Sequence, residues 1–174
     1  MADRVGQQLG NYRLLRLLGR GGFAEVYLGE HVYLKRRAAL KVLHTSLEDE
    51  DAGQFLAEAQ TLARLSHAHI VHVFDFAVEQ GTPFLAMDYA PRGTLRKLYP
   101  HGSCLSLDTT AVYMKQIAAA LQYAHDQRVI HRDVKPENML LGPDQQLLLS
   151  DFGISILAAT SEQLSTREHA GTLA

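Results

Sequence analysis

The 174-residue sequence contains one cysteine, no tryptophan and 5 prolines. A lone cysteine, Cys104, cannot form an intramolecular disulfide or supply a cysteine-rich metal site, which indicates a reducing, cytoplasmic environment. An N-terminal apolar stretch of the secretory type is also missing. The best candidate for a membrane span, residues 111–124, is short and is interrupted by Lys115 and Gln116, so we expect no membrane segment in this chain.

The sequence also has no large excess of positive or negative charge. The sequence has 17 Lys and Arg against 19 Asp and Glu, a formal net charge of −2. Proteins that bind a nucleic-acid backbone usually carry a basic excess, so the composition does not favour nucleic acid as a partner. The hydrophobic fraction of 47% is that of a folded domain and excludes intrinsic disorder.

The N-terminal part of the chain is strand-like with one helix. The pattern predicts three antiparallel strands within residues 12–43, an amphipathic helix with an acidic start over 48–65, and a hairpin over 70–89 whose turn is polar. We therefore expect an antiparallel sheet with one inserted helix.

The composition shifts after residue 90, where a helical unit begins. A long helix is predicted from Ser106, as N-cap, to about Gln127, and Val112 is among its expected buried residues. A short hairpin is predicted over residues 139–150, and residues 158–174 read as a mobile loop. The fold class is α+β.

A glycine cluster lies between the first two predicted strands, with the sequence Gly19-Arg20-Gly21-Gly22-Phe23-Ala24-Glu25-Val26. Glycines allow backbone N–H groups to approach phosphate oxygens, although a hairpin turn without a ligand is an equally good interpretation of this stretch alone. A dinucleotide-binding fold would need a helix directly after the glycines, and a P-loop would need Gly-Lys-Ser/Thr, so both are disfavoured.

Two charged residues in apolar surroundings extend this interpretation. Lys41 lies on an apolar strand and Glu58 lies at the core-facing margin of the predicted helix. Each alone is usually a solvated surface residue. Together they can form an interior ion pair that holds a cation near nucleotide phosphates.

The most specific motifs are His131-Arg132-Asp133-Val134-Lys135-Pro136-Glu137-Asn138 and Asp151-Phe152-Gly153. With the glycine cluster, their order resembles the protein kinase family. Lys135, two residues after Asp133, resembles the serine/threonine-specific pattern, and the glycine cluster resembles bacterial eukaryotic-like (Hanks-type) kinases. The nine histidines invite a metal-site interpretation, but their spacing and the lack of cysteine partners disfavour it.

The resemblance implies a two-lobe kinase fold with ATP and Mg²⁺ as ligands. It implies that Asp133 orients the substrate hydroxyl, that Lys135 stabilises the γ-phosphate, and that Lys41, held by Glu58, contacts the α- and β-phosphates. Asn138 and Asp151 would hold Mg²⁺, because hard oxygen ligands suit that ion. The implied ATP-binding residues are Leu18, Gly19, Arg20, Gly21, Gly22, Phe23, Ala24, Glu25, Val26, Ala39, Lys41, Met87, Asp88, Ala90 and Leu140.

Four further residues have regulatory roles by resemblance. Arg132 would dock a phosphorylated activation loop, with Ser165 or Thr166 as the autophosphorylation site. Phe152 would stack with His131 in the column of side chains that marks the active arrangement.

The implied domain boundaries are an N-terminal extension over residues 1–11 and a kinase domain over 12–174. Within it we expect an N lobe over about 12–89, a hinge over about 88–93 and a partial C lobe over about 94–174, with the sequence ending inside the activation segment. A partial C lobe would leave apolar surface on the long helix, favouring low stability and self-association.

Three functions remain open at this point. The leading one is a signalling kinase that phosphorylates serine and threonine residues of protein substrates. The first alternative is a catalytically impaired nucleotide-binding or interaction module. The second is a small-molecule phosphotransferase with the same fold, which the intact motif around Asp133 disfavours.

Overall fold

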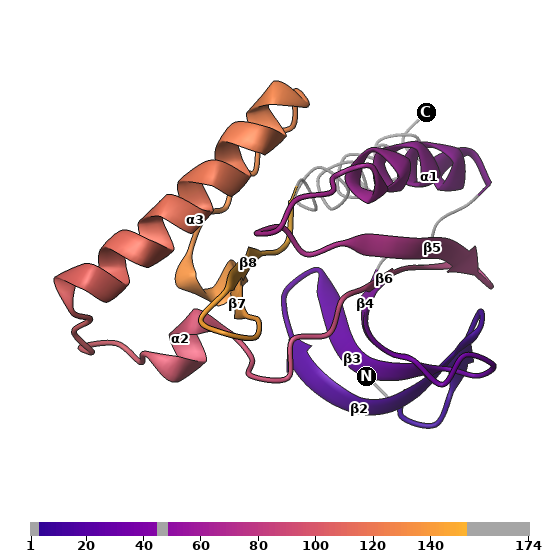
Figure 1. Ribbon diagram of the computed structural model, residues 1–174. Helices are drawn as coiled ribbons and strands as arrows, with labels where there is room; N and C mark the ends of the chain where they lie inside the picture. Colours follow the sequence, from indigo (N-terminus) through magenta and orange to yellow (C-terminus); the bar gives the residue numbers. More distant parts are fainter. Residues whose placement is uncertain (1–3, 45–48, 153–174) are drawn as a thin grey trace, which may run out of the picture.

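A curled six-stranded antiparallel sheet forms the N-terminal half of the molecule. The computed structural model describes residues 4–44 and 49–152 (Figure 1). The strand order is β1-β2-β3-β4-β6-β5. The elements are β1 (Gln8–Leu9), β2 (Tyr12–Arg20), β3 (Ala24–His31), β4 (Arg37–Leu43), α1 (Asp49–Ala63), β5 (Val73–Glu79) and β6 (Thr82–Met87). The predicted strands, helix and hairpin of this half are confirmed.

Alternation along β4 explains how the sheet forms two cores. Leu40 and Val42 face a core inside the curl, whereas Ala39 and Leu43 face a second core that continues into the C-terminal half. Gly29 leaves room for the buried Leu40 side chain, with which a Cβ atom at this position would collide. Residues 8–9, within the predicted N-terminal extension, add β1 to the sheet.

The C-terminal half is built around one long helix. Its elements are α2 (Leu95–Leu98), α3 (Leu107–Asp126), the 3₁₀ turn η1 (Pro136–Asn138), and the hairpin β7 (Met139–Leu141) and β8 (Leu147–Leu149). Ser106 caps α3 as predicted, accepting a hydrogen bond from the Thr109 N–H at 3.2 Å. Val112 was predicted to be buried but is exposed, because its neighbour Tyr113 takes the inward position.

Backbone hydrogen bonds fix the β7–β8 hairpin against the N-terminal half. The loop after α1 pairs with β8: the Val71 N–H donates to the Leu149 carbonyl at 3.0 Å, and the Leu149 N–H donates to the His69 carbonyl at 2.9 Å. The Leu141 N–H donates to the Gly93 carbonyl at 2.9 Å. These bonds hold the hairpin beside the connecting segment 88–93. Within the described residues, no helix is long and apolar enough to be a membrane span.

Candidate active site

A cavity of about 360 Å³ lies between the sheet and the β7–β8 hairpin, which is a volume suited to a small-molecule ligand. Apolar side chains from β2, β3, β4, β6 and β7 form much of its lining. Nine of the residues expected to bind ATP or metal line it: Leu18, Gly19, Val26, Ala39, Lys41, Met87, Ala90, Leu140 and Asp151. The sheet and the hairpin thus bring together residues that are more than a hundred positions apart.

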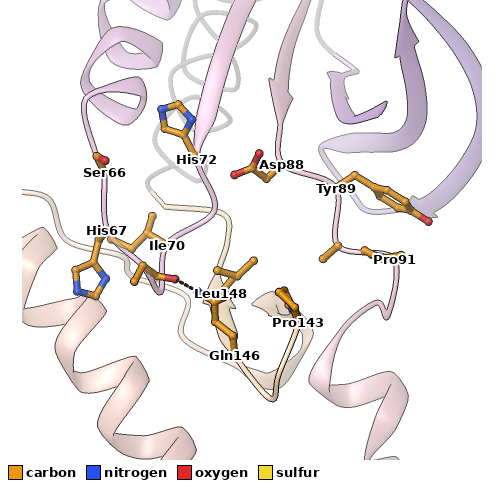
Figure 2. Close-up of a pocket in the computed structure, with 13 residues that line it drawn as sticks. Ser66, His67, Ile70, His72, Asp88, Tyr89, Pro91, Pro143, Gln146 and Leu148 are labelled. Carbon is orange, nitrogen blue, oxygen red and sulfur yellow. Dashed lines mark hydrogen bonds between the residues drawn. The ribbon is translucent and has the colours of Figure 1, made fainter. Parts of the chain in front are cut away.

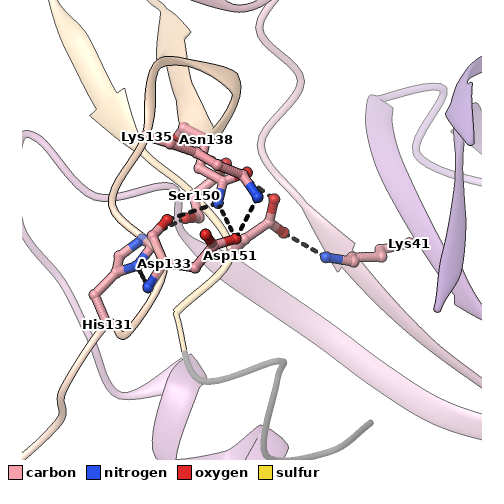
Figure 3. Close-up of polar contacts among 7 residues, drawn as sticks. All are labelled: Lys41, His131, Asp133, Lys135, Asn138, Ser150 and Asp151. Atoms are coloured by element: carbon pink, nitrogen blue, oxygen red, sulfur yellow. Dashed lines mark hydrogen bonds and ion pairs between the residues drawn. The ribbon is translucent and has the colours of Figure 1, made fainter. Parts of the chain in front are cut away.

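Lys41 and Asp151 form an ion pair at the cavity, with Nζ and Oδ1 2.5 Å apart (Figure 3). Their side chains are only 12% and 29% exposed, so solvent screens the pair less than it screens a surface pair. Asp151 follows β8 with a positive φ of 67°, a strained conformation for a non-glycine residue that often occurs at functional sites. This arrangement concentrates opposite charges at the cavity wall.

Lys41 pairs with a residue that the sequence analysis placed among the metal ligands, Asp151. Glu58, the predicted partner of Lys41, lies half-buried on α1. Its pairing with Lys41 stays a prediction.

A second polar network surrounds Asp133 (Figure 3). The Asn138 side-chain amide donates to the Asp133 carbonyl at 2.8 Å and to its carboxylate at 3.0 Å. Lys135 Nζ lies 2.7 Å from the same carboxylate. Pro136, at the start of η1, has the fixed φ that suits a helical first turn, and this turn returns Asn138 to Asp133. The three predicted catalytic-loop residues therefore lie together.

The interactions in this network favour the charged forms of Asp133 and Lys135. The hydrogen bond from Lys135 is the main cause that lowers the pKa of the Asp133 carboxyl, opposed by partial burial and assisted by the bond from Asn138. In return, the hydrogen bond to Asp133 raises the pKa of Lys135. Asp133 is therefore a carboxylate, a hydrogen-bond acceptor, at neutral pH.

His131 forms hydrogen bonds that position the backbone of this network. It is buried, with Nδ1 accepting from the Asp133 N–H at 3.2 Å and Nε2 2.8 Å from the Ser150 carbonyl. These two bonds specify the neutral tautomer with the proton on Nε2. Burial lowers the pKa of His131, against the opposing effects of the Ser150 carbonyl, Asp151 and Asp133. Its ring centroid lies 4.5 Å from that of Phe152, with the two ring planes tilted by 60°.

The donor set fits a magnesium ion bound together with a phosphorylated ligand. Because the amide nitrogen of Asn138 is committed to Asp133, its Oδ1 is left as a neutral oxygen donor, and Asp151 supplies a carboxylate. Across the described part of the chain, no cluster of three or more His, Cys, Asp or Glu side chains could hold a metal ion. A metal at Asn138 and Asp151 therefore needs additional oxygen ligands, which phosphates provide.

The tip of the glycine cluster lies outside the lining of the described cavity. The predicted binding residues at this tip are absent from the described cavity lining: Arg20, Gly21, Gly22, Phe23, Ala24 and Glu25. Glu25 is 4% exposed and lies on the opposite face of β3 from Val26. It accepts from the Tyr27 hydroxyl at 2.7 Å and pairs with Arg20 at 3.0 Å. We therefore assign Glu25 to the support of the loop.

The side chain of Asp88, a residue of the predicted hinge, lines a different cavity. Its carboxylate pairs with Arg36 at 3.1 Å and points to a second cavity, of about 590 Å³, behind the connecting segment (Figure 2). Tyr89, Ala90 and Pro91 line both cavities. The connecting segment therefore separates the two cavities.

Several lining residues were missed by sequence reasoning. They are polar or charged, and of these only Glu137 lies inside a quoted motif: Arg16, Thr94, Lys97, Glu137 and Ser150. Thr94 could have been found as the N-cap of α2, but α2 has four residues and gives no periodic signal. Arg132, the predicted regulatory arginine, is exposed with a φ of 69°, and Ser165 and Thr166 lie outside the described residues.

Comparisons with known proteins agree with these motifs. Residues 12–174 match the family model of the protein kinase domain. The chain is 38% identical over 160 residues to Aurora kinase B of Danio rerio, covering 91% of this chain and 49% of that protein. It is 39% identical over 171 residues to the serine/threonine-protein kinase PknD of Mycobacterium tuberculosis, covering 97% of this chain and 26% of that protein.

The solved structures give the same picture. The crystal structure of a point mutant of the Mycobacterium tuberculosis PknI kinase domain superposes with a TM-score of 0.77 at 35% identity. The match covers 88% of this chain and 64% of that chain. The chain thus spans about half the length of one relative, a quarter of another, and two thirds of the solved kinase domain.

Proposed function

The chain belongs to the protein kinase family, and from this premise we propose that it takes part in ATP-dependent phosphoryl transfer to serine and threonine hydroxyls of proteins. The observation that carries the proposal is the arrangement at the cavity. The Lys41–Asp151 pair and Ser150 join an apolar cavity to the Asp133 network. Phosphoryl transfer depends mainly on positioning and charge stabilisation, which this arrangement can supply.

We assign the roles of the cavity residues from their chemistry. Val26, Ala39 and Leu140 offer flat apolar contacts for the adenine, and the backbone of residues 88–90 offers its polar edge hydrogen bonds. Lys41 holds the α- and β-phosphates. We assign Glu58, half-buried on α1, to hold Lys41 in place.

A second group of residues acts in the phosphate transfer itself. The Asp133 carboxylate accepts the hydrogen bond of the substrate hydroxyl and orients it, and Lys135 neutralises charge on the transferred group. Asn138 and Asp151 hold Mg²⁺, which neutralises phosphate charge when bound. Lys135 must release Asp133 to reach a phosphate, and the exposure of both side chains permits this movement.

We propose the following domain organisation. Residues 12–89 form the N lobe, 88–93 the hinge and 94–174 part of the C lobe. We further propose that the protein is a cytoplasmic signalling kinase with protein substrates.

Magnesium-ATP binding and phosphate transfer to a generic protein substrate test this function. Asp133→Asn should keep magnesium-ATP binding by calorimetry and lower transfer by about 100-fold or more, because the hydroxyl is no longer oriented by a carboxylate. Asp144→Asn is the matched control. Asp144 is exposed in the β7–β8 turn with a positive φ that asparagine also tolerates, so this variant should behave as wild type.

The second candidate function is a nucleotide-binding module without transfer. It is favoured by the coverage of only 64% of the solved kinase domain. Binding of magnesium-ATP without transfer in the wild-type chain would support this candidate. Absence of binding would overturn both candidates.

A further inference from the structure

A β-bulge places two arginines on the same face of the sheet. The pairing of β2 with β3 shifts between Leu14 and Arg16, so that Leu15 is the extra residue. Arg13 lies opposite Glu30 and Arg16 lies opposite Leu28. Without the bulge, residues three apart on a strand would face opposite sides. With it, both arginines share the face that lines the cavity.

This face continues past the cavity as a row of charged side chains. Arg16 lines the cavity, and the next row of the sheet is Arg13, Glu30 and Arg37, which lie directly opposite one another on β2, β3 and β4. Arg13 and Arg37 are exposed. They stand two strands apart, about 10 Å, with one half-buried glutamate between them.

Lys97 adds a cation from the C-terminal half. It lies on α2, across the segment 88–93 from β2 and β3, and lines the same cavity as Arg16 (Figure 1). We call Arg13, Arg16, Arg37 and Lys97 the basic surface.

Two basic residues next to the basic surface form ion pairs, unlike the four cations of the basic surface. Arg36 pairs with Asp88 at 3.1 Å, and Arg96 pairs with Glu137 at 2.8 Å. No ion pair within 4.0 Å involves the four cations of the basic surface among the residues that the structure describes, and Glu30 lies 4.0 Å from Lys35. A chain with a net charge of −2 thus places four cations at the hinge side of its cavity, with Glu30 as the acidic side chain between Arg13 and Arg37.

We propose that the basic surface binds an extended acidic segment of a protein substrate. In an extended segment, side chains at alternate positions lie about 7 Å apart on one side, so three acidic residues span about 13 Å. The spacing of about 10 Å between Arg37 and Arg13 lies within this length, and Arg16 follows further along β2. Arginine suits this role because its planar group binds carboxylates through two parallel hydrogen bonds.

The position of the surface makes it a recruitment site. It lies at the side of segment 88–93, whereas Asp133 lies beyond the Lys41–Asp151 pair. The acidic segment therefore binds away from the hydroxyl that accepts the phosphate. The assignment of the partner as a substrate rests on the proposed kinase function, whereas binding of the acidic segment can be measured without any phosphate transfer.

The test uses the whole chain and a fluorescein-labelled peptide of about ten residues with glutamate at alternate positions, followed by fluorescence anisotropy. We expect the double variant Arg13→Glu/Arg37→Glu to bind it about tenfold more weakly than wild type, and we expect higher salt to weaken wild-type binding. The control Arg64→Glu/Lys115→Glu makes the same change in net charge at sites on other elements and should bind as wild type.

The other possible results also test the proposal. Equal binding by the double variant and wild type, or equal binding of a glutamine version of the peptide, overturns the proposal. Loss of binding to phosphatidylserine vesicles in the double variant, without peptide binding by wild type, overturns it in favour of a membrane surface. Magnesium-ATP binding is measured in parallel, since Arg13 and Arg37 do not line the cavity. Its absence in wild type would contradict the kinase function and leave peptide docking intact.

Discussion

At the scale of single residues, His131 shows how burial and hydrogen bonding select one charge state. Its two nitrogens hold the backbone of Asp133 and the carbonyl of Ser150 at fixed positions, and the bond at Nδ1 requires an unprotonated nitrogen. A proton on Nδ1 would therefore break the bond that positions the backbone of the candidate catalytic aspartate. The sequence motif names this histidine, but only the structure gives its tautomer.

The lowered pKa of His131 predicts a loss of stability in mild acid. Burial is the main cause of this lowering, while Asp133 and Asp151 oppose it. As pH falls below about 6.5, the unfolded chain takes up a proton that the folded chain refuses, so the free energy of unfolding decreases until the folded-state pKa is passed. Urea denaturation between about pH 7.5 and 5 measures this slope. His131→Gln, which keeps a donor and an acceptor but does not titrate, should give a flatter curve.

His67 provides the comparison for this experiment. Burial also lowers its pKa, assisted by His69, so His67→Gln should flatten the curve through a separate site. Parallel curves for wild type and His131→Gln would contradict the lowered pKa of His131.

At the scale of elements, long periodic segments were predictable and short or non-local features were not. The α3 helix and its cap Ser106 followed from a repeated apolar spacing and one side-chain oxygen. The bulge at Leu15 could not be predicted, since apolar and polar residues in β2 do not alternate cleanly. The ion pair of Lys41 joins residues 110 positions apart, and only the docking of β8 against the sheet determines it.

The Ser106 cap gives a prediction at this scale. Ser106→Ala removes the side-chain acceptor of the Thr109 N–H and should lower the free energy of unfolding by about 1 kcal/mol, as thermal or urea denaturation would show. Ser106→Asp should restore most of it, because aspartate also caps and its charge suits a helix N-terminus. Ser103→Ala, in the exposed loop before the helix, should change little. An unchanged stability for Ser106→Ala would mean that tertiary packing alone holds this end of α3.

At the scale of the whole molecule, one apolar core joins the two halves. Leu43 and Leu85 from the sheet, Phe55 from α1 and Leu149 from β8 belong to the same buried cluster. Because this core includes the floor of the cavity, unfolding of either half should disturb the site. The outer face of α3 is different, since it is apolar and exposed.

The exposed outer face of α3 predicts that two copies of the chain associate, as the sequence analysis also expects. Leu107, Ala111, Met114 and Ala118 recur at spacings of four and three residues, the pattern that pairs helices, and Leu107 and Met114 are 88% and 61% exposed. Burying each large side chain in a partner surface contributes roughly 2 kcal/mol. We therefore expect concentration-dependent association in sedimentation velocity, which Leu107→Lys/Met114→Lys abolishes and Leu98→Lys, on exposed α2, does not. A wild-type chain that sediments as a monomer at all concentrations would show that this face alone is too small to hold two copies together.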